Sequence, residues 1–340
     1  MRKLVSILLV TLLVSCQREP SYITVDGTML GTTFHIVART TLAPSEIYNE
    51  VARIDAEAKA SMSIFNENSL LSRINTNRTD TLDVHLLRTI AVAANAYHIS
   101  DGYYDITVKP LTEAYGFAAK KRIERPNIDS LLEFVGFEKF RVNGRQIVKQ
   151  DPRLQIDLNS IAKGYTVDLV ADRLEMLSVT DYIVEVGGEI RCKGVNAKGL
   201  EWRVGVDSPF DGNNAPGEHR QQIIPLTDSS LATSGNYRRF FIDSKGNKIS
   251  HTINPRTGMS SQSRLLSATV IAKRCIEADA LATMFMALGD EKAIEKAKEL
   301  SHKIQVYFIL DKGSGSSSDS DKLNNDYEIF TTIKQLKDKQ

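Results

Sequence analysis

The chain has 340 residues, of which 42% are hydrophobic and 25% charged, and its 43 Lys and Arg residues nearly balance 42 Asp and Glu residues. This composition is typical of a globular protein with one large domain or two small ones. The near-zero net charge gives no electrostatic reason to expect binding to nucleic acid or to an anionic membrane surface.

The N-terminus has the build of a secretory signal. Arg2 and Lys3 precede an apolar run, Leu4 to Val14, that is too short to span a bilayer comfortably. The run ends in Leu-Val-Ser-Cys at Cys16, which resembles a bacterial lipobox. We expect a signal peptide over residues 1–16, lipidation of Cys16, and a periplasm-facing lipoprotein anchored in a membrane through that cysteine. The alternative is an ordinary signal in which Cys16 is incidental.

The hydrophobic pattern that follows predicts an α+β fold. Residues 17–27 are assigned to a linker and residues 28–340 to one domain, and the alternation of residues 22–39 predicts a β-hairpin across that boundary. Helices are predicted over residues 45–65, 82–100, 129–136, 160–177, 275–290 and 290–301. Strands are predicted over residues 181–194, 201–209, 221–235, 238–243, 248–254, 263–273 and 303–310.

Runs of adjacent strands between helices indicate largely antiparallel sheets flanked by helices, not a βαβ series. Residues 313–326 are rich in Gly, Ser and Asp, so they are expected to form a polar surface loop before a last short strand. Apart from Cys16, the cysteines are Cys192 and Cys275. They could pair in an oxidising compartment, but their spacing is not that of a metal site, and by default we treat both as small buried residues.

The helix predicted over residues 275–290 carries an acid among apolar residues. Asp279 and Thr283 are four positions apart, so they share one helix face. A carboxylate and a hydroxyl near backbone carbonyls are hard oxygen ligands that suit Mg²⁺. The alternative is that Asp279 caps the helix or lies at the surface.

Two glycine- or lysine-containing segments are candidates for binding phosphate groups. Asp157 ends a strand, and Asn159 or Ser160 can cap a helix that begins at Ile161, where free N–H groups and the positive charge of Lys163 favour an anion. A capped helix with a solvated lysine is the alternative. The glycine pair Gly187–Gly188 indicates a bulge or a ligand pressed against the backbone, or equally a tight hairpin turn.

One histidine precedes a turn-forming segment. His251 lies on a predicted strand that leads into Asn-Pro-Arg-Thr-Gly at residues 254–258. A histidine in this position could act as a general base, or it could be an ordinary surface-strand residue.

These motifs occur together in a specific order. Leu-Gly-Thr at 30–32 is followed by SMSIFNENSLLSRIN, GYYDITVKPL, AYGF, IDLNSIAKGYTVD, VGGEI, SGNYRR, HTINPRTG and EADALATMF. In this order they closely resemble the ApbE family of flavin transferases, from about Thr28 to about Phe308. Known members are periplasmic lipoproteins, and the resemblance implies an ApbE-like, T-fold-like architecture.

The resemblance also implies a function. Family members bind FAD with Mg²⁺ and transfer its FMN half to a Ser or Thr hydroxyl of an exported acceptor protein, releasing AMP. Acceptors would be subunits of Rnf- or Nqr-type complexes or other FMN-binding exported domains, with no nucleic acid involved. Two alternatives remain open, namely a metal-dependent FAD pyrophosphatase that yields FMN and AMP, and an FAD-binding lipoprotein without chemistry.

Site residues carry over from the matching motifs. The metal ligands would be Asp279, Thr283 and the main-chain carbonyls of Ala162 and Ala282. The FAD contacts would be Leu30, Phe65, Tyr115, Gly116, Phe117, Asn159, Tyr165 and Ile253, with Gly187 and Gly188 letting backbone approach the nucleotide. His251 would activate the acceptor hydroxyl, with Asp157 and Lys163 orienting phosphate or metal. Leu30 replaces the family's usual Met and Phe65 its usual Tyr or Trp, and both changes keep an apolar side chain.

Overall fold

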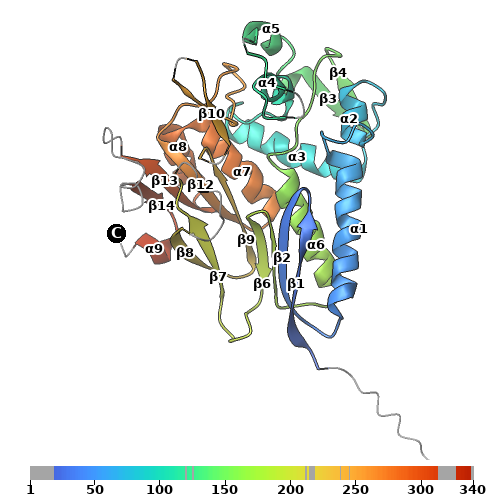
Figure 1. Cartoon of the computed structure of the whole chain (residues 1–340), viewed down its shortest axis with the longest axis vertical. Coiled ribbons are helices and arrows are strands. Elements are labelled where there is room, and N and C mark those ends of the chain that lie inside the picture. The colour runs from blue at the N-terminus through green and yellow to red at the C-terminus, as the bar shows by residue number, and fades with distance from the viewer. Residues whose placement is uncertain are drawn as a thin grey trace, which may run out of the picture.

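The computed structural model describes residues 19–118, 121–124, 126–210, 213, 219–237, 239–244, 246–312 and 327–337. The predicted signal peptide with Cys16 and the predicted loop over residues 313–326 lie outside these residues. In the described part, a large twisted sheet carries helices packed against it (Figure 1).

The central sheet has eight strands, and every neighbouring pair is antiparallel. In spatial order they are β1 (Ser21–Met29), β2 (Thr32–Thr40), β5 (Tyr182–Val186), β6 (Glu189–Lys193), β9 (Ser229–Gly235), β12 (Leu265–Ala272), β13 (Gln305–Asp311) and β14 (Tyr327–Thr331). The prediction of largely antiparallel sheets flanked by helices is confirmed.

Two tight turns set the register of this sheet. Leu30 (φ 51°) and Gly31 (φ 78°) join β1 to β2, and Gly187 (φ 57°) and Gly188 (φ 99°) join β5 to β6. Positive φ at both central positions matches the twist of the flanking strands. Of the alternatives for residues 187–188, the tight hairpin turn is the one found. Leu30 has no glycine's freedom, so its conformation carries strain.

The principal helices are α1 (Pro44–Met62), α3 (Val84–Ile99), α6 (Ala162–Met176), α7 (Cys275–Leu288) and α8 (Asp290–Glu299). Helix α7 packs against β9 and β12 on one side and against α6 and α3 on others. Its sequence is apolar almost all round, as expected for a helix surrounded by protein. Gly289 (φ 78°) ends it.

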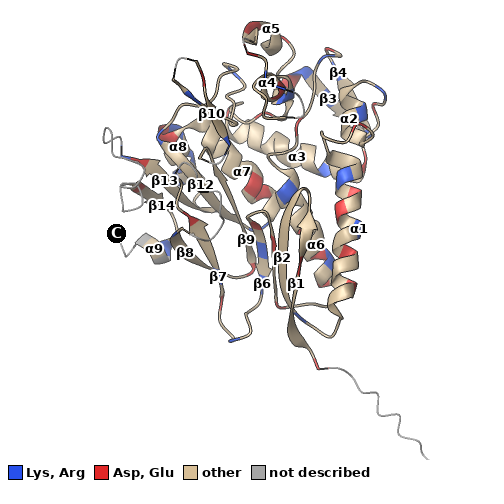
Figure 2. Ribbon diagram, in the orientation of Figure 1, with Lys and Arg blue, Asp and Glu red and all other residues tan. Residues whose placement is uncertain are grey.

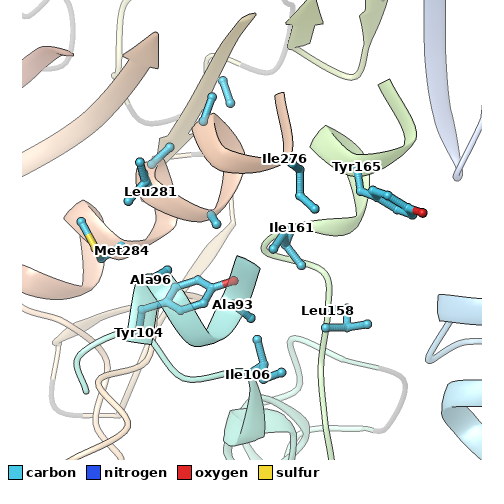
Figure 3. Close-up of a cluster of buried hydrophobic side chains, with 14 of the residues drawn as sticks. Ala93, Ala96, Tyr104, Ile106, Leu158, Ile161, Tyr165, Ile276, Leu281 and Met284 are labelled. Carbon is cyan, nitrogen blue, oxygen red and sulfur yellow. The ribbon is translucent and has the colours of Figure 1, made fainter. Parts of the chain in front are cut away.

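Buried side chains lock α3, α6 and α7 together (Figure 3). Ala93 and Ala96 of α3, Ile161 just before α6, and Ile276 and Met284 of α7 belong to this cluster, and each is at most 6% exposed. Burying a large aliphatic side chain stabilises the fold by about 1.5–3 kcal/mol. The cluster therefore fixes the start of α6 against α7.

A second layer covers part of the other face of the sheet. Strands β7 (Trp202–Asp207) and β8 (Arg220–Leu226) form an antiparallel hairpin. Its inward residues, including Trp202 and Val204, pack on Ile190 of β6 and Leu231 of β9. Glu189, next to Ile190, points to the opposite face of β6 because side chains alternate along a strand.

Shorter elements complete the described chain and bound the cleft described below. They are α2 (Leu70–Asn75), the 3₁₀ helix η1 (Ile106–Val108), α4 (Lys109–Ala114), α5 (Ile128–Leu132), the 3₁₀ helix η2 (Phe137–Lys139), β3 (Phe140–Asn143), β4 (Gln146–Lys149), β10 (Phe240–Ile242), β11 (Lys248–Ser250) and α9 (Lys334–Lys337). Several of them gather at one end of the molecule, the top in Figure 1.

Two local predictions are wrong. Strand β1 begins at Ser21 and pairs with β2 from there, so residues 21–27 belong to the sheet and not to a linker. Helix α6 begins at Ala162 without a side-chain cap. The Asn159 N–H donates instead to Asp157, and the Ser160 hydroxyl bonds to the hydroxyl of Tyr104.

Both remaining cysteines are buried and unpaired, which confirms their default interpretation. The burial of Cys192 and Cys275 leaves each below 2% exposed. None of the described helices is long and apolar enough to cross a membrane.

Candidate active site

A cleft of about 840 Å³ lies between α7, the start of α6, the strands β2, β5, β6 and β9, and the β7–β8 hairpin. Residues between 103 and 117, where η1 and α4 lie, and between 235 and 253, where β10 and β11 lie, also line it. Ten of the predicted site residues line it, namely Phe117, Asp157, Asn159, Lys163, Gly187, Gly188, His251, Ile253, Asp279 and Thr283. Segments from five regions of the sequence therefore meet in one cavity.

Asp279 is buried in the wall of this cleft, with 3% of its surface exposed. Its Oδ2 accepts a hydrogen bond of 2.8 Å from the Gly164 N–H, in the first turn of α6. A Cβ on Gly164 would lie 2.3 Å from the Cys275 carbonyl oxygen, so only glycine lets the two helices come this close. Burial, reinforced by the charge of Glu189, raises the pKa of Asp279 to about 7.

Lys163 and Glu189 form an ion pair beside Asp279. Glu189 is 2% exposed and lies on β6, directly after the Gly187–Gly188 turn. Burial disfavours the ammonium of Lys163, but the carboxylates of Glu189 and Asp279 outweigh it and raise the pKa of Lys163. Basic and acidic segments of α6 and α7 accordingly lie side by side in Figure 2. With both carboxylates ionised, the three side chains leave one negative charge in a buried place.

This arrangement fits a divalent cation. A buried, uncompensated carboxylate favours a positive ligand, and the Thr283 hydroxyl lies on the same face of α7, 3.1 Å from the Ser234 hydroxyl. Among the described residues, no cluster of three His, Cys, Asp or Glu side chains forms a metal site. A cation here would therefore depend on one carboxylate together with neutral oxygens, which suits Mg²⁺. The Ala162 carbonyl accepts from the Thr166 hydroxyl at 2.8 Å, and neither it nor buried Ala282 lines the cleft.

His251 stands on another wall, beside Phe117, with 6.3 Å between ring centroids. Its Nδ1 lies 3.3 Å from the Arg239 carbonyl oxygen. In the tautomer in which Nδ1 donates to that carbonyl, Nε2 keeps a free lone pair. Burial, with the positive charge of Arg239, lowers the pKa of His251 to about 4. The imidazole is therefore neutral at pH 7 and can accept a proton.

Asp157 and Asn159 form a polar turn at the edge of the cleft. The carboxylate of Asp157 accepts from the Asn159 N–H at 2.9 Å and from the Thr112 hydroxyl at 3.3 Å. Burial raises the pKa of Asp157. The predicted free N–H groups of α6 are only partly available, because Asp279 already accepts from Gly164.

Five predicted FAD contacts do not line the cleft. Leu30 occupies the β1–β2 turn, where its N–H donates to Asp55 at 2.8 Å. Phe65 is 62% exposed on the loop after α1. Tyr165 is 3% exposed in the core, and its hydroxyl lies 3.0 Å from His85 Nδ1. Tyr115 and Gly116 end α4, where Tyr115 packs in a small apolar cluster and a Cβ on Gly116 would meet Arg122.

Comparison with known proteins gives the family. The sequence profile of the ApbE family matches residues 30–308. This chain belongs to the ApbE family. The match includes every cleft residue, from Thr32 to Ala287.

Relatives of the ApbE-family chain cover nearly its whole length. The FAD:protein FMN transferase of Haemophilus influenzae is 33% identical over 336 residues, which cover 93% of this chain and 95% of that protein. The FAD:protein FMN transferase of Vibrio cholerae is 33% identical over 322 residues, covering 92% of this chain and 94% of that protein.

Solved structures agree with the ApbE fold. The flavin transferase ApbE from Vibrio cholerae gives a TM-score of 0.79 at 29% identity, covering 92% of this chain and 97% of that one. The flavinyl transferase ApbE of Pseudomonas stutzeri, in its apo form, gives 0.77 at 27% identity, covering 93% and 97%.

Sequence reasoning missed several residues of this ApbE cleft. Glu189, which forms the ion pair with Lys163, was not predicted. It directly follows the Gly187–Gly188 pair, and the sequence pattern indicated a role only for those two glycines. The hydroxyl of Tyr104 lies 2.8 Å from that of Ser160, and both residues line the cleft. Arg203 and Arg220 of the β7–β8 hairpin also line it, and no sequence motif singled them out.

Proposed function

We propose that this chain, an FAD:protein FMN transferase by family, moves the FMN half of FAD onto a Ser or Thr hydroxyl of an exported acceptor protein, with Mg²⁺ bound and AMP released. The observation that most supports the proposal is the meeting of Asp279, Thr283, Lys163 and His251 in one cleft. Asp279 and Thr283 come from α7, Lys163 comes from α6 and pairs with Glu189 of β6, and His251 is a neutral histidine.

The walls of the cleft suit the two parts of FAD. Phe117 and Ile253 offer apolar surface to a flat ring system. Lys163, held by Glu189, offers a positive charge to the pyrophosphate, and the backbone turn at Gly187–Gly188 allows a close approach. FAD would therefore lie with its phosphates near Asp279.

Asp279 and Thr283 would hold Mg²⁺, together with the main-chain oxygens that the family resemblance assigns. When bound, the ion would neutralise phosphate charge as the bond between phosphorus and the bridging oxygen of the pyrophosphate breaks. The chain's own part is to present one buried carboxylate and one hydroxyl from a single helix face, with Gly164 fixing the carboxylate's orientation.

His251 would accept the proton in the transfer step. The acceptor hydroxyl oxygen attacks the phosphorus of the FMN half, and a new phosphoester bond forms as its proton passes to Nε2 of His251. The bond from that phosphorus to the bridging oxygen breaks, and AMP leaves with this oxygen. A neutral hydroxyl needs such a base or a metal to attack phosphorus at a useful rate.

The test combines the full chain with FAD, Mg²⁺ and a purified FMN-binding domain of an Nqr-type subunit. The expected result is an acceptor heavier by one FMN group in intact-mass analysis, with AMP released in equal amount. Free FMN and AMP with an unchanged acceptor would favour the pyrophosphatase activity. Intact FAD with every acceptor tried would contradict both enzymatic functions.

We further propose that Cys16 anchors the protein to a membrane of the cell envelope, facing the periplasm. The lipobox-like Leu-Val-Ser-Cys sequence supports this location. Cys16→Ser should move the protein from the membrane fraction to the soluble fraction and abolish labelling by a radioactive fatty acid. Equal membrane association of the two forms would contradict the anchor.

A further inference from the structure

One edge of strand β7 faces the cleft. β7 pairs with β8 on one side, and no other strand in the described part of the chain pairs with it. Five consecutive residues, Arg203 to Asp207, line the cleft. Because neighbouring side chains of a strand point to opposite faces, a run of five means that the edge itself is turned toward the cavity.

The backbone along this edge is available for pairing. Over the described residues, the main-chain groups of 203–206 make no hydrogen bond other than those to β8. A row of unpaired main-chain N–H and C=O groups is a template for pairing with another extended chain. An edge of this kind beside a catalytic cleft can take a peptide as an added strand.

Two arginines mark the outward face of the same hairpin. Arg203 is exposed on β7, and the Arg220 side chain of β8 lies over Gly205, where a Cβ would come within 3.0 Å of Arg220 Cδ. Within the part of the chain that the structure describes, neither guanidinium has an ion pair or a hydrogen bond. By contrast, Arg191 and Arg274 are paired with buried carboxylates. Two unpaired guanidinium groups at a cleft are suited to carboxylates.

Nearby carboxylates are already engaged. Glu185 of β5 accepts from the Gly188 N–H at 2.6 Å, and Asp26 lies 2.6 Å from His35 Nδ1. Asp207, at the end of β7, also has a partner of its own. Among the described residues of this part of the cleft, Arg203 and Arg220 are therefore the charged side chains without a hydrogen-bond or ion-pair partner.

The predicted contacts of FAD lie elsewhere. Phe117, Asn159 and Ile253 come from segments other than the hairpin, and none of the predicted FAD contacts belongs to β7 or β8. A transfer reaction needs both substrates in the cleft together. The part of the cleft beside the edge of β7 therefore remains for the second substrate, the acceptor protein.

We propose that the acceptor protein docks as an extended, acidic segment along the edge of β7, with its carboxylates on Arg203 and Arg220 and its hydroxyl carried toward Asp279 and His251. The inference rests on the proposed function, since it names the site of the protein substrate. Backbone pairing would hold the segment with little dependence on its sequence, and the arginines would select acidic flanks.

The test uses Arg203→Glu, Arg220→Glu and the double variant of the full chain, with Arg141→Glu as the matched control. Arg141 is an exposed arginine on β3, outside the cleft. The probe is the same purified Nqr-type acceptor domain. The KM for this acceptor should rise by about tenfold in each single variant and further in the double one, because reversal replaces attraction by repulsion. The affinity for FAD should stay within about twofold, as for other surface substitutions.

A second measurement reports docking without chemistry. Amide hydrogen exchange of residues 203–206 should slow when the acceptor domain is added to the wild type, and exchange in β3–β4 should not change. An unchanged KM for the acceptor in the double variant would overturn the docking site. A loss of FAD affinity as large as the rise in the KM for the acceptor would also overturn it. Protection of β7 without any transfer would support docking and contradict the proposed function.

Discussion

At the scale of single residues, Asp279 lies where an ionised carboxylate is destabilising unless a ligand neutralises it. It is buried, near Glu189, and its pKa is raised to about 7. Asp279→Asn keeps an acceptor for the Gly164 N–H but removes the charge. We expect the apo protein to unfold at the same or a higher temperature, because a desolvated charge has been removed.

The same substitution should remove the Mg²⁺-dependent activity. A bound metal contributes several kcal/mol to phosphoryl transfer, so the loss should be at least about hundredfold. Calorimetric titration of the variant with MgCl₂ should show no binding. Glu277→Gln, an exposed acid on the same helix, is the control and should leave both measurements unchanged. Full turnover by Asp279→Asn would contradict the metal site.

His251 leads to a prediction about pH. Its pKa lies near 4, below the ordinary 6.5, so the fraction of neutral imidazole stays high as pH falls from 8 to 5. At saturating Mg²⁺, which would hold Asp279 ionised, the acid limb of kcat/KM that is due to His251 should therefore lie well below pH 6. His251→Ala should lower transfer far more than FAD binding. Equal losses would mean that the ring only positions the ligand.

Arg239 provides the matched pair of variants for this histidine. Its positive charge contributes to the lowered pKa of His251, and its side chain also donates to the Phe117 carbonyl at 2.9 Å. Arg239→Gln removes the charge and should move the acid limb to higher pH. Arg239→Lys keeps the charge but also loses the guanidinium hydrogen bond to the Phe117 carbonyl. The acid limb of kcat/KM of this variant should therefore stay in place.

At the scale of elements, α6 and α7 hold each other at two points. Asp279 of α7 accepts from Gly164 of α6, while fully buried Asp168 of α6 accepts from the Cys275 and Ile276 N–H groups at 3.1 and 3.0 Å. Asp168→Ala would leave these two buried N–H donors without an acceptor and would remove the ion pairs of Asp168 with Arg191 and Arg274. We expect a loss of about 3–5 kcal/mol in the free energy of unfolding, measured by denaturant titration.

A variant of Asp172 is the control that distinguishes the effect of this helix contact from the effect of the surrounding charges. Asp172 pairs with the same two arginines, Arg191 and Arg274, but accepts no hydrogen bond from the main-chain N–H groups of α7. Asp172→Ala should cost about 1 kcal/mol or less, since the site is partly exposed. The half-saturating Mg²⁺ concentration should rise in Asp168→Ala and not in Asp172→Ala. Equal effects would mean that the charge network, not the helix contact, orients Asp279.

The elements that the sequence predicted well are those fixed by local pattern. The β1–β2 and β5–β6 hairpins and the largely apolar helix α7 follow from alternation, glycine residues at the turns and helical periodicity. The start of α6 was mispredicted because the acceptor for its Gly164 N–H is Asp279, 115 positions along the chain. Elements of four to six residues, such as α2 and β3, carry too little periodicity to be found.

At the scale of the whole molecule, the site could be predicted only as far as ordered motifs go. The resemblance named ten residues that do share one cleft. Glu189 escaped it because its role depends on β6 lying beside the start of α6, a contact that no local pattern records. The β7 edge escaped it for the same reason, since an edge is a property of sheet order.

Because the cleft is lined from Thr32 to Ala287, its ligands should stabilise the whole fold. A ligand at a hundred times its dissociation constant adds about 2.7 kcal/mol to the free energy of unfolding. FAD with Mg²⁺ should therefore raise the melting temperature by several degrees, and FAD without Mg²⁺ by less. Asp279→Asn should abolish the difference between these two conditions but keep the shift due to FAD alone. If Mg²⁺ adds nothing in the wild type, then the cation does not bind between α6 and α7, and the negative charge left by Asp279, Glu189 and Lys163 has another partner.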